Sequence, residues 1–207
     1  TGVKNLATVC SATQTSFVHI STDYVFDGTA NNPYGEESST NPMGVYGNSK
    51  LKGEEDALSV NANTLIIRTS WVYSVYGNNF VKTMLRLMQS RPDISVVADQ
   101  KGSPTHATDL ANAILQIIES KVWQPGIFHY SNEGVITWFD FAAAIKKITG
   151  SSCSIHPITT EQYPTPAMRP KYSVLDKSKI KNTFNLYIPN WEDSLKKCLA
   201  KMPAIKS

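Results

Sequence analysis

The sequence contains few cysteines and no grouping of metal ligands. Cys10, Cys153 and Cys198 are the only three in 207 residues, and their wide separation gives neither a disulfide framework nor a zinc pattern. Scarce, unpaired cysteine is typical of a reducing compartment, so we expect a cytoplasmic protein. The four histidines are also scattered, and we assign no metal to them.

Long apolar runs and strong charge are absent as well. A membrane-spanning helix needs about 18 or more apolar residues, whereas the longest candidate, Ala111–Ile118, is short and is interrupted by Asn112 and Gln116. The formal net charge is only +3, from 20 Lys and Arg against 17 Asp and Glu. Because no basic cluster stands out, the sequence predicts neither a membrane protein nor a nucleic-acid-binding protein.

A third absence is a glycine-rich turn between a strand and a helix, which is where many α/β proteins bind the pyrophosphate of a dinucleotide. None of the eleven glycines forms such a motif after a strand. The chain opens on Thr1-Gly2-Val3, inside a helical pattern and without an initiator Met or a preceding strand. We therefore expect a chain that begins part-way through its fold.

The sequence does contain a regular alternation of strand and helix patterns. Short apolar runs predict strands, and apolar residues at helical spacing predict the helices between them. The order is typical of βαβ units and predicts an α/β fold with a mostly parallel sheet. Five prolines between residues 151 and 189 predict a loop-rich segment there. The predicted strands are 16–21, 65–67, 95–98 and 126–130, and the predicted helices are 3–13, 44–58, 78–88, 108–118, 137–148 and 191–202.

Polar residues follow two of the predicted strands. The first strand ends in Ser21-Thr22-Asp23-Tyr24, and the second ends in Arg68-Thr69-Ser70-Trp71. Open parallel sheets bind ligands beyond the carboxyl ends of their strands, so a site is expected here. Polar residues also leave strands as ordinary turns, and neither segment identifies a site by itself.

Tyr46 and Lys50 form a sharper candidate pair. Four residues apart on a predicted helix, they share one face. A free tyrosine has a pKa near ~10 and is a poor acid at neutral pH, but a nearby cation stabilises the phenolate and lowers that pKa. The pair can therefore protonate a carbonyl oxygen, and the hydroxyl of Thr22 could hold that carbonyl. Because Tyr-x-x-x-Lys is also frequent by chance, the pair predicts a catalytic site only together with the segments around it.

That context is a resemblance to a known family. A strand ending in Ser-Thr, a long loop, Tyr-x-x-x-Lys on a helix and a second buried strand resemble the extended branch of the short-chain dehydrogenase/reductase superfamily. Several blocks resemble, more narrowly, the dTDP-4-dehydrorhamnose reductase family, and together they span nearly the whole chain. They are STDYVFDG at 21–28, YGNSK at 46–50, RTSWVY at 68–73, DQKGSPT at 99–105 with DLA at 109–111, and RPKYSVLD at 169–176.

The resemblance implies an activity and a set of roles. Members of the family reduce the 4-keto group of dTDP-4-dehydro-L-rhamnose with hydride from NADPH or NADH, in dTDP-rhamnose biosynthesis. By resemblance, Tyr46 protonates the carbonyl oxygen, Lys50 hydrogen-bonds the nicotinamide ribose and tunes the tyrosine, and Thr22 completes the catalytic triad. Arg169 suits a diphosphate because its guanidinium offers paired donors. The implied cofactor contacts are Ser21, Tyr46, Lys50 and Thr69, and the implied substrate contacts are Asp23, Tyr24, Trp71, Asn79, Gln100 and Arg169.

The resemblance also divides the chain. Residues 1–75 would be the remnant of a Rossmann-like dinucleotide-binding domain, and residues 76–207 would be mainly a smaller substrate-binding region, with some elements of about 92–121 returning to the Rossmann sheet. Roughly 80 residues of the family's N-terminal part would be lacking, about half a typical domain. We therefore expect the isolated chain to be inactive or nearly so. Family resemblance alone further suggests a homodimer and a bound Mg²⁺, for which no ligands can be assigned.

Two other functions stay open. The first is another extended-branch enzyme, a nucleotide-sugar epimerase or dehydratase. A dehydratase normally adds a second carboxylate beside the catalytic threonine, whereas Asp23 is followed here by Tyr24. The second is a non-catalytic binding partner that resembles the regulatory subunit of an animal methionine adenosyltransferase. Retention of Thr22, Tyr46 and Lys50 together favours catalysis over that reading, although such subunits can also keep the triad.

Overall fold

The computed structural model describes residues 2–165 and 169–202. Its first part is built on a three-stranded parallel sheet in the order β1 (Phe17–Thr22), β2 (Thr64–Thr69) and β7 (Gly126–Tyr130). All of the central strand β2 is buried, which explains its continuous apolar run. The register pairs Thr22 with Thr69 and Thr69 with Tyr130, so the carboxyl ends of the three strands lie side by side.

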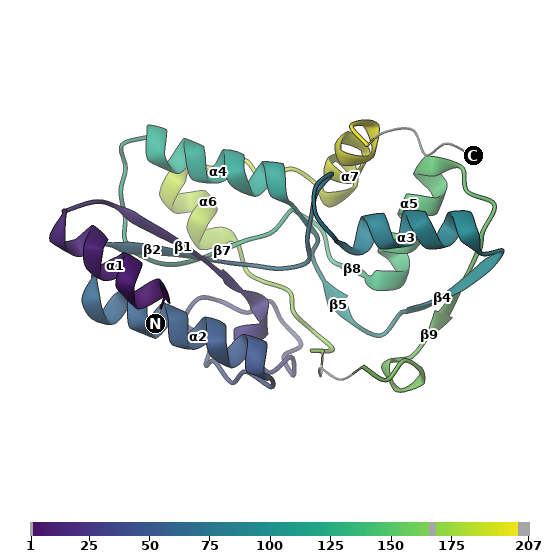
Figure 1. The fold of residues 1–207 in the computed structure, drawn as a ribbon, viewed down its shortest axis with the longest axis horizontal. Helices are drawn as coiled ribbons and strands as arrows, with labels where there is room; N and C mark the ends of the chain where they lie inside the picture. Colours follow the sequence, from purple (N-terminus) through teal and green to yellow (C-terminus); the bar gives the residue numbers. More distant parts are fainter. Residues whose placement is uncertain (1, 166–168, 203–207) are drawn as a thin grey trace.

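Helices cover both faces of this sheet (Figure 1). On one face lie α1 (Gly2–Ala12) and α2 (Val45–Val60), and on the other lie α4 (Ala107–Glu119) and α6 (Ser178–Phe184). Side chains alternate between the faces of a strand. Leu65 and Ile67 therefore pack with α4 and α6, while Arg68 reaches α2.

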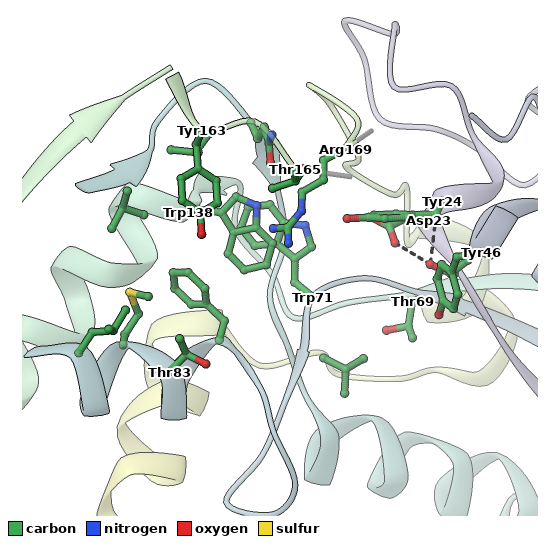
Figure 2. Close-up of a pocket in the computed structure, with 18 of the residues that line it drawn as sticks. Asp23, Tyr24, Tyr46, Thr69, Trp71, Thr83, Trp138, Tyr163, Thr165 and Arg169 are labelled. Carbon is green, nitrogen blue, oxygen red and sulfur yellow. Dashed lines mark hydrogen bonds between the residues drawn. The ribbon is translucent and has the colours of Figure 1, made fainter. Parts of the chain in front are cut away.

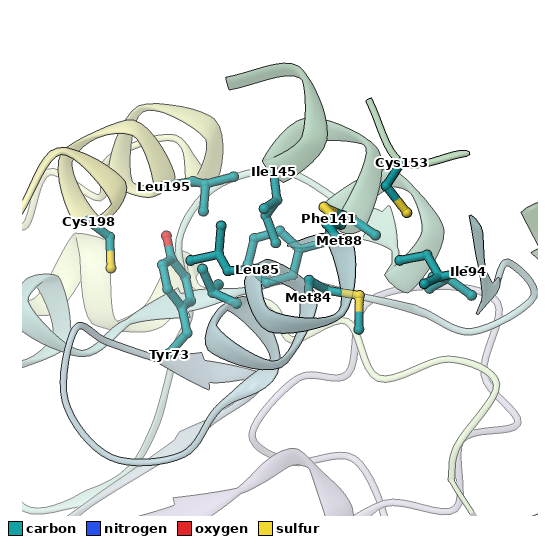
Figure 3. Packing of buried hydrophobic residues seen from close by; sticks show 13 residues of the cluster. Tyr73, Met84, Leu85, Met88, Ile94, Phe141, Ile145, Cys153, Leu195 and Cys198 are labelled. Carbon is teal, nitrogen blue, oxygen red and sulfur yellow. The ribbon is translucent and has the colours of Figure 1, made fainter. Parts of the chain in front are cut away.

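The second part of the chain is a smaller α/β unit. Strands β4 (Asp93–Val97) and β9 (Ser154–Ile158) pair in parallel, and α3 (Phe80–Ser90), α5 (Trp138–Thr149) and α7 (Trp191–Ala200) pack beside them. Figure 3 shows their shared core, in which Phe141, Ile145 and Leu195 are fully buried. Burying one such side chain contributes about 1.5–3 kcal/mol, so this cluster stabilises the packing of the unit.

Short elements and a buried polar cluster join the two parts. β3 (Val72–Tyr73) pairs with β6 (Thr105–His106), and β5 (Lys101–Gly102) pairs with β8 (Ile136–Thr137). The Asp109 carboxylate, on α4, accepts hydrogen bonds from Asn132 Nδ2 at 2.8 Å and Ser194 Oγ at 2.5 Å. Because Ser194 belongs to α7, this cluster ties a helix of the first part to a helix of the second. The 3-10 turns η1 (Asp23–Val25) and η2 (Thr160–Gln162) complete the list of elements.

The predicted α/β class is confirmed, and each predicted strand and helix is present with ends shifted by a few residues. Within residues 92–121, β4 joins β9 in a separate sheet because Ile94 and Val96 face the core of the second part, whereas α4 packs against the main sheet. β9 and α6 lie in the segment that was expected to be loop-rich.

Candidate active site

A cavity of about 890 Å³ opens at the carboxyl ends of β1 and β2 and extends toward α3 and β4. Figure 2 shows its lining, with Asp23, Tyr24 and Tyr46 on one side and Trp138 and Tyr163 on the other. Residues from both parts of the chain therefore share one cavity. Ten of the predicted site residues line it: Ser21, Thr22, Asp23, Tyr24, Tyr46, Lys50, Thr69, Trp71, Gln100 and Arg169.

The end of β1 supplies three adjacent polar side chains. The Thr22 hydroxyl donates to Asp23 Oδ1 at 3.0 Å and accepts from the backbone N–H of Tyr24 at 3.2 Å, so it also caps the turn η1. Asp23 is buried, and desolvation raises the pKa of its carboxyl to about 7, although hydrogen bonds from Ser173 and Thr22 oppose the shift. Burial also raises the pKa of Tyr24.

The start of α2 places Tyr46 and Lys50 beside that strand end. The Tyr46 ring is exposed toward the cavity and meets the Tyr24 ring edge-on, with centroids 5.9 Å apart. The Lys50 ammonium donates to the Ile20 carbonyl of β1 at 2.5 Å. Partial burial lowers the pKa of Lys50, and the nearby Glu54 carboxylate opposes this. The helix thus presents a phenol and a cation to one side of the cavity.

Aromatic rings form the opposite wall. Trp71 and Trp138 stack with centroids 3.5 Å apart and ring planes 11° apart, and Phe80 packs against Trp138 at 4.6 Å. Trp71 has a φ of 48°, a left-handed conformation that costs energy for a bulky residue. Gly102 accommodates the ring, because a Cβ there would lie 2.6 Å from it. This flat surface suits a sugar or a base.

Polar groups complete the lining. The Gln100 amide donates to Thr160 Oγ1 at 3.1 Å, while its buried Oε1 has no partner among the described residues. Thr69 Oγ1 contacts Thr105 Oγ1 at 3.1 Å. The exposed side chain of Arg169 also lines the cavity and is labelled in Figure 2. The lining therefore includes an acceptor without a partner among the described residues and an exposed cation.

Asn79 does not line the cavity. Its side-chain oxygen caps α3 by accepting from the Lys82 N–H, and its amide donates to the carbonyls of Ser74 and Tyr76. Sequence reasoning missed several other lining residues, because a single aromatic or polar residue in a helix or a loop carries no local signal for a site. They are Phe80, Thr83, Arg91, Trp138, Tyr163 and Thr165.

Two negative findings apply to the described part of the chain. Residues 2–165 and 169–202 contain no group of three or more His, Cys, Asp or Glu side chains placed to hold a metal ion. No helix within the same residues combines the length and apolar character needed to cross a membrane.

The fold and the site together define an extended short-chain dehydrogenase/reductase-like protein. The chain has a parallel sheet with helices on both faces, and a Tyr and a Lys on one helix beside the end of β1. The family model described as the RmlD substrate binding domain matches residues 1–204. The chain belongs to this family.

Known relatives agree with that assignment. The chain is 45% identical over 205 residues to a dTDP-4-dehydrorhamnose reductase of Sinorhizobium fredii, covering 95% of this chain and 69% of the relative. A crystal structure of the Clostridium acetobutylicum dTDP-4-dehydrorhamnose reductase superposes with a TM-score of 0.91 at 42% identity, covering 96% of this chain and 70% of the other. The Bacillus anthracis enzyme, crystallised with NADP, gives 0.92 at 39% identity, covering 98% and 71%.

Proposed function

We propose that this protein reduces the 4-keto group of dTDP-4-dehydro-L-rhamnose to a hydroxyl with hydride from NADPH, yielding dTDP-L-rhamnose. The observation that carries the proposal is that Thr22, Tyr46 and Lys50 line one cavity in a chain of this family. NADPH is favoured over NADH because a similar structure was solved with NADP.

The residues at the end of β1 fit a nicotinamide cofactor. The buried Ser21 hydroxyl has no partner among the described residues, and Ser21, Lys50 and Thr69 line the cavity together. Hydroxyl and ammonium groups suit the hydroxyls of a ribose. We assign Lys50 and Tyr46 to the nicotinamide ribose, and Ser21 and Thr69 to the same end of the cofactor. When bound, NADPH supplies the hydride that forms the new C–H bond at C4.

The chain's own groups would handle the proton. The Tyr46 hydroxyl donates its proton to the C4 oxygen as the carbonyl π bond breaks, so one hydride and one proton together give the alcohol. The Lys50 cation stabilises the phenolate that remains until solvent returns a proton. Thr22 holds the carbonyl oxygen in line with Tyr46. Its hydroxyl already contacts Asp23, so it must reorient or share that hydrogen bond.

The rest of the cavity would bind the nucleotide sugar. The Trp71–Trp138 stack offers a face to a ring, Gln100 Oε1 offers an acceptor, and the guanidinium of Arg169 suits the diphosphate. Asp23 and Tyr24 lie beside the position of the reacting sugar. Asn79 would act indirectly, by fixing the start of α3. A homodimer and a cytoplasmic location stay predictions of the sequence.

One assay distinguishes the proposed reduction from the two alternative functions. We expect the protein expressed from its complete gene to consume one NADPH for each dTDP-4-dehydro-L-rhamnose, with dTDP-L-rhamnose identified by NMR. An epimerase or dehydratase would change the sugar without net NADPH consumption. A binding subunit would do neither and would instead co-purify with a stable protein partner. Either of those two results would refute the proposed reduction.

A further inference from the structure

Helix α2 carries a third residue on the face that presents Tyr46 and Lys50. Glu54 follows Lys50 by four residues and Tyr46 by eight, so the three side chains form one row along the helix. Unlike the exposed Tyr46, Glu54 is only 2% exposed. It therefore lies at the buried end of the row, under the residues that would perform the chemistry.

The Glu54 carboxylate is held by Arg68, a residue of strand β2. Arg68 Nε lies 3.0 Å from Glu54 Oε1 and Arg68 Nη2 lies 2.7 Å from Oε2, and the Arg68 side chain is also buried. Two parallel hydrogen bonds of this kind define the orientation of both groups. Because Arg68 belongs to β2 and Lys50 bonds to β1, the row is anchored on two strands at once.

Burying two charges is costly, and an apolar pair of similar volume often holds two elements together as well. The ion pair therefore needs a reason beyond packing. The Lys50 side chain supplies one, because it is half-buried and donates to a neutral carbonyl rather than to an acid. Among the causes that act on the pKa of Lys50, burial lowers it and only the Glu54 carboxylate raises it.

Other charged groups on the elements that pack against α2 do not replace Glu54. From β1, the buried His19 has a pKa lowered by burial and by Lys50, and raised by Glu54. From η1, Asp23 is only partly ionised near pH 7, because burial raises the pKa of its carboxyl to about 7. α1 offers only the exposed Lys4 and the half-buried Cys10, and β2 offers Arg68 itself.

We propose that Glu54 is a positioning residue for the reduction: its carboxylate, held by Arg68, keeps the Lys50 ammonium charged beside Tyr46. The assignment deepens the proposed function and rests on it. It predicts that loss of the Glu54 charge acts on the protonation of Lys50, and through it on the acid that Tyr46 provides. A purely structural ion pair would affect stability and the position of the helix, but not the titration of Lys50.

The direct test is an NMR titration of protein labelled with ¹³C at the lysine Cε, with the Lys50 signal identified by its loss in Lys50→Arg. We expect Glu54→Gln to lower the Lys50 midpoint by about one pH unit, and Glu54→Asp, which keeps the charge, to restore most of it. Glu55→Gln is the matched control, because Glu55 is adjacent on α2 but exposed. A midpoint that does not move in folded Glu54→Gln would overturn the proposal.

Leaving Arg68 unpaired can prevent folding. In that case the doubly neutral Glu54→Gln/Arg68→Gln variant takes the place of the single one. Because this variant also removes the Arg68 cation, the Lys50 midpoint should fall by less than in the single variant, and a midpoint that does not move would again overturn the proposal. The pH profile of kcat gives a second readout: the limb at high pH should move to lower pH with the Lys50 midpoint, whereas a structural defect would lower the plateau and leave the limb in place. Because the titration needs no turnover, it tests the role of Glu54 separately from the NADPH assay, which tests the reduction itself.

Discussion

At the scale of single residues, Asp23 shows how the site departs from what stability alone would favour. Its carboxyl is fully enclosed at the end of β1, next to the residue that caps η1. Desolvation raises the pKa of this group to about 7, far above the ordinary value of an aspartate. Perturbed groups of this kind concentrate at functional sites, which supports the position of the cavity.

The raised pKa of Asp23 makes a prediction about stability. A carboxyl with a higher pKa in the folded state contributes stability that is fully present below its unfolded pKa, 3.8, and is lost as the pH rises to about 7. Asparagine cannot ionise and escapes this loss. We expect the free energy of unfolding of Asp23→Asn, relative to wild type, to rise between pH 4 and pH 8 by up to roughly 4 kcal/mol.

Urea denaturation at several pH values measures this difference. Asp193→Asn is the control, because Asp193 is exposed on α7. If the stability difference between Asp23→Asn and wild type stays constant with pH, Asp23 ionises normally in the folded protein and this description of the site is wrong.

The pair Tyr46 and Lys50 could be found from the sequence because helical spacing alone places residues four apart on one face. The positions of Asn79 and Trp138 relative to the cavity could not be predicted in this way. Whether Asn79 caps its helix or faces a ligand depends on the loop before α3, and Trp138 reaches the cavity only because α5 begins beside Trp71. Both depend on tertiary packing, which no local pattern encodes.

At the scale of elements, the position of α2 depends on a close approach between Gly47 and the turn η1. A Cβ on Gly47 would lie 2.1 Å from the Tyr24 carbonyl oxygen and 2.9 Å from the Pro42 Cβ. Backbone atoms cannot yield as a flexible side chain can, so the start of the helix would have to move. Tyr46 is the preceding residue, and it would move too.

Gly47→Ala should therefore damage both stability and catalysis. We expect a loss of about 1–3 kcal/mol in the free energy of unfolding, as for other overpacked sites. A displacement of the proton donor by about 1 Å would lower kcat on the order of 10²-fold. Gly44→Ala is the control, because Gly44 has an extended backbone and nothing within 4 Å of its added Cβ. Wild-type kcat in Gly47→Ala would contradict the role assigned to this contact.

Some helices and strands were easier to predict from the sequence than others. α3 and α5 have apolar residues at helical spacing, and α5 ends at Gly150, whose φ of 69° is the left-handed cap that glycine favours. β9 and α6 escaped prediction for physical reasons. β9 carries a proline and largely exposed residues at the edge of a two-stranded sheet, and α6 has only seven residues, two of them buried.

At the scale of the whole molecule, the site exists because two cores are joined. One core lies between the main sheet and α4 and α6, and the other lies among α3, α5 and α7. The cavity takes its acid and cation from the first part and its aromatic wall from both. The alternation of strand and helix patterns predicted the α/β class. The pairing of β4 with β9 and the resulting cavity could not be predicted in this way, because they depend on contacts between residues about 60 positions apart in the sequence.

The central claim is that Tyr46 is the proton donor of a reductase. The most direct test is kcat of Tyr46→Phe for reduction of dTDP-4-dehydro-L-rhamnose by NADPH, in protein expressed from its complete gene, with the exposed Tyr187→Phe as the matched control. Removing the hydroxyl alone should lower kcat by ~10²-fold or more while Tyr187→Phe keeps the wild-type rate. A Tyr46→Phe variant that reduces the sugar at the wild-type rate would contradict the account.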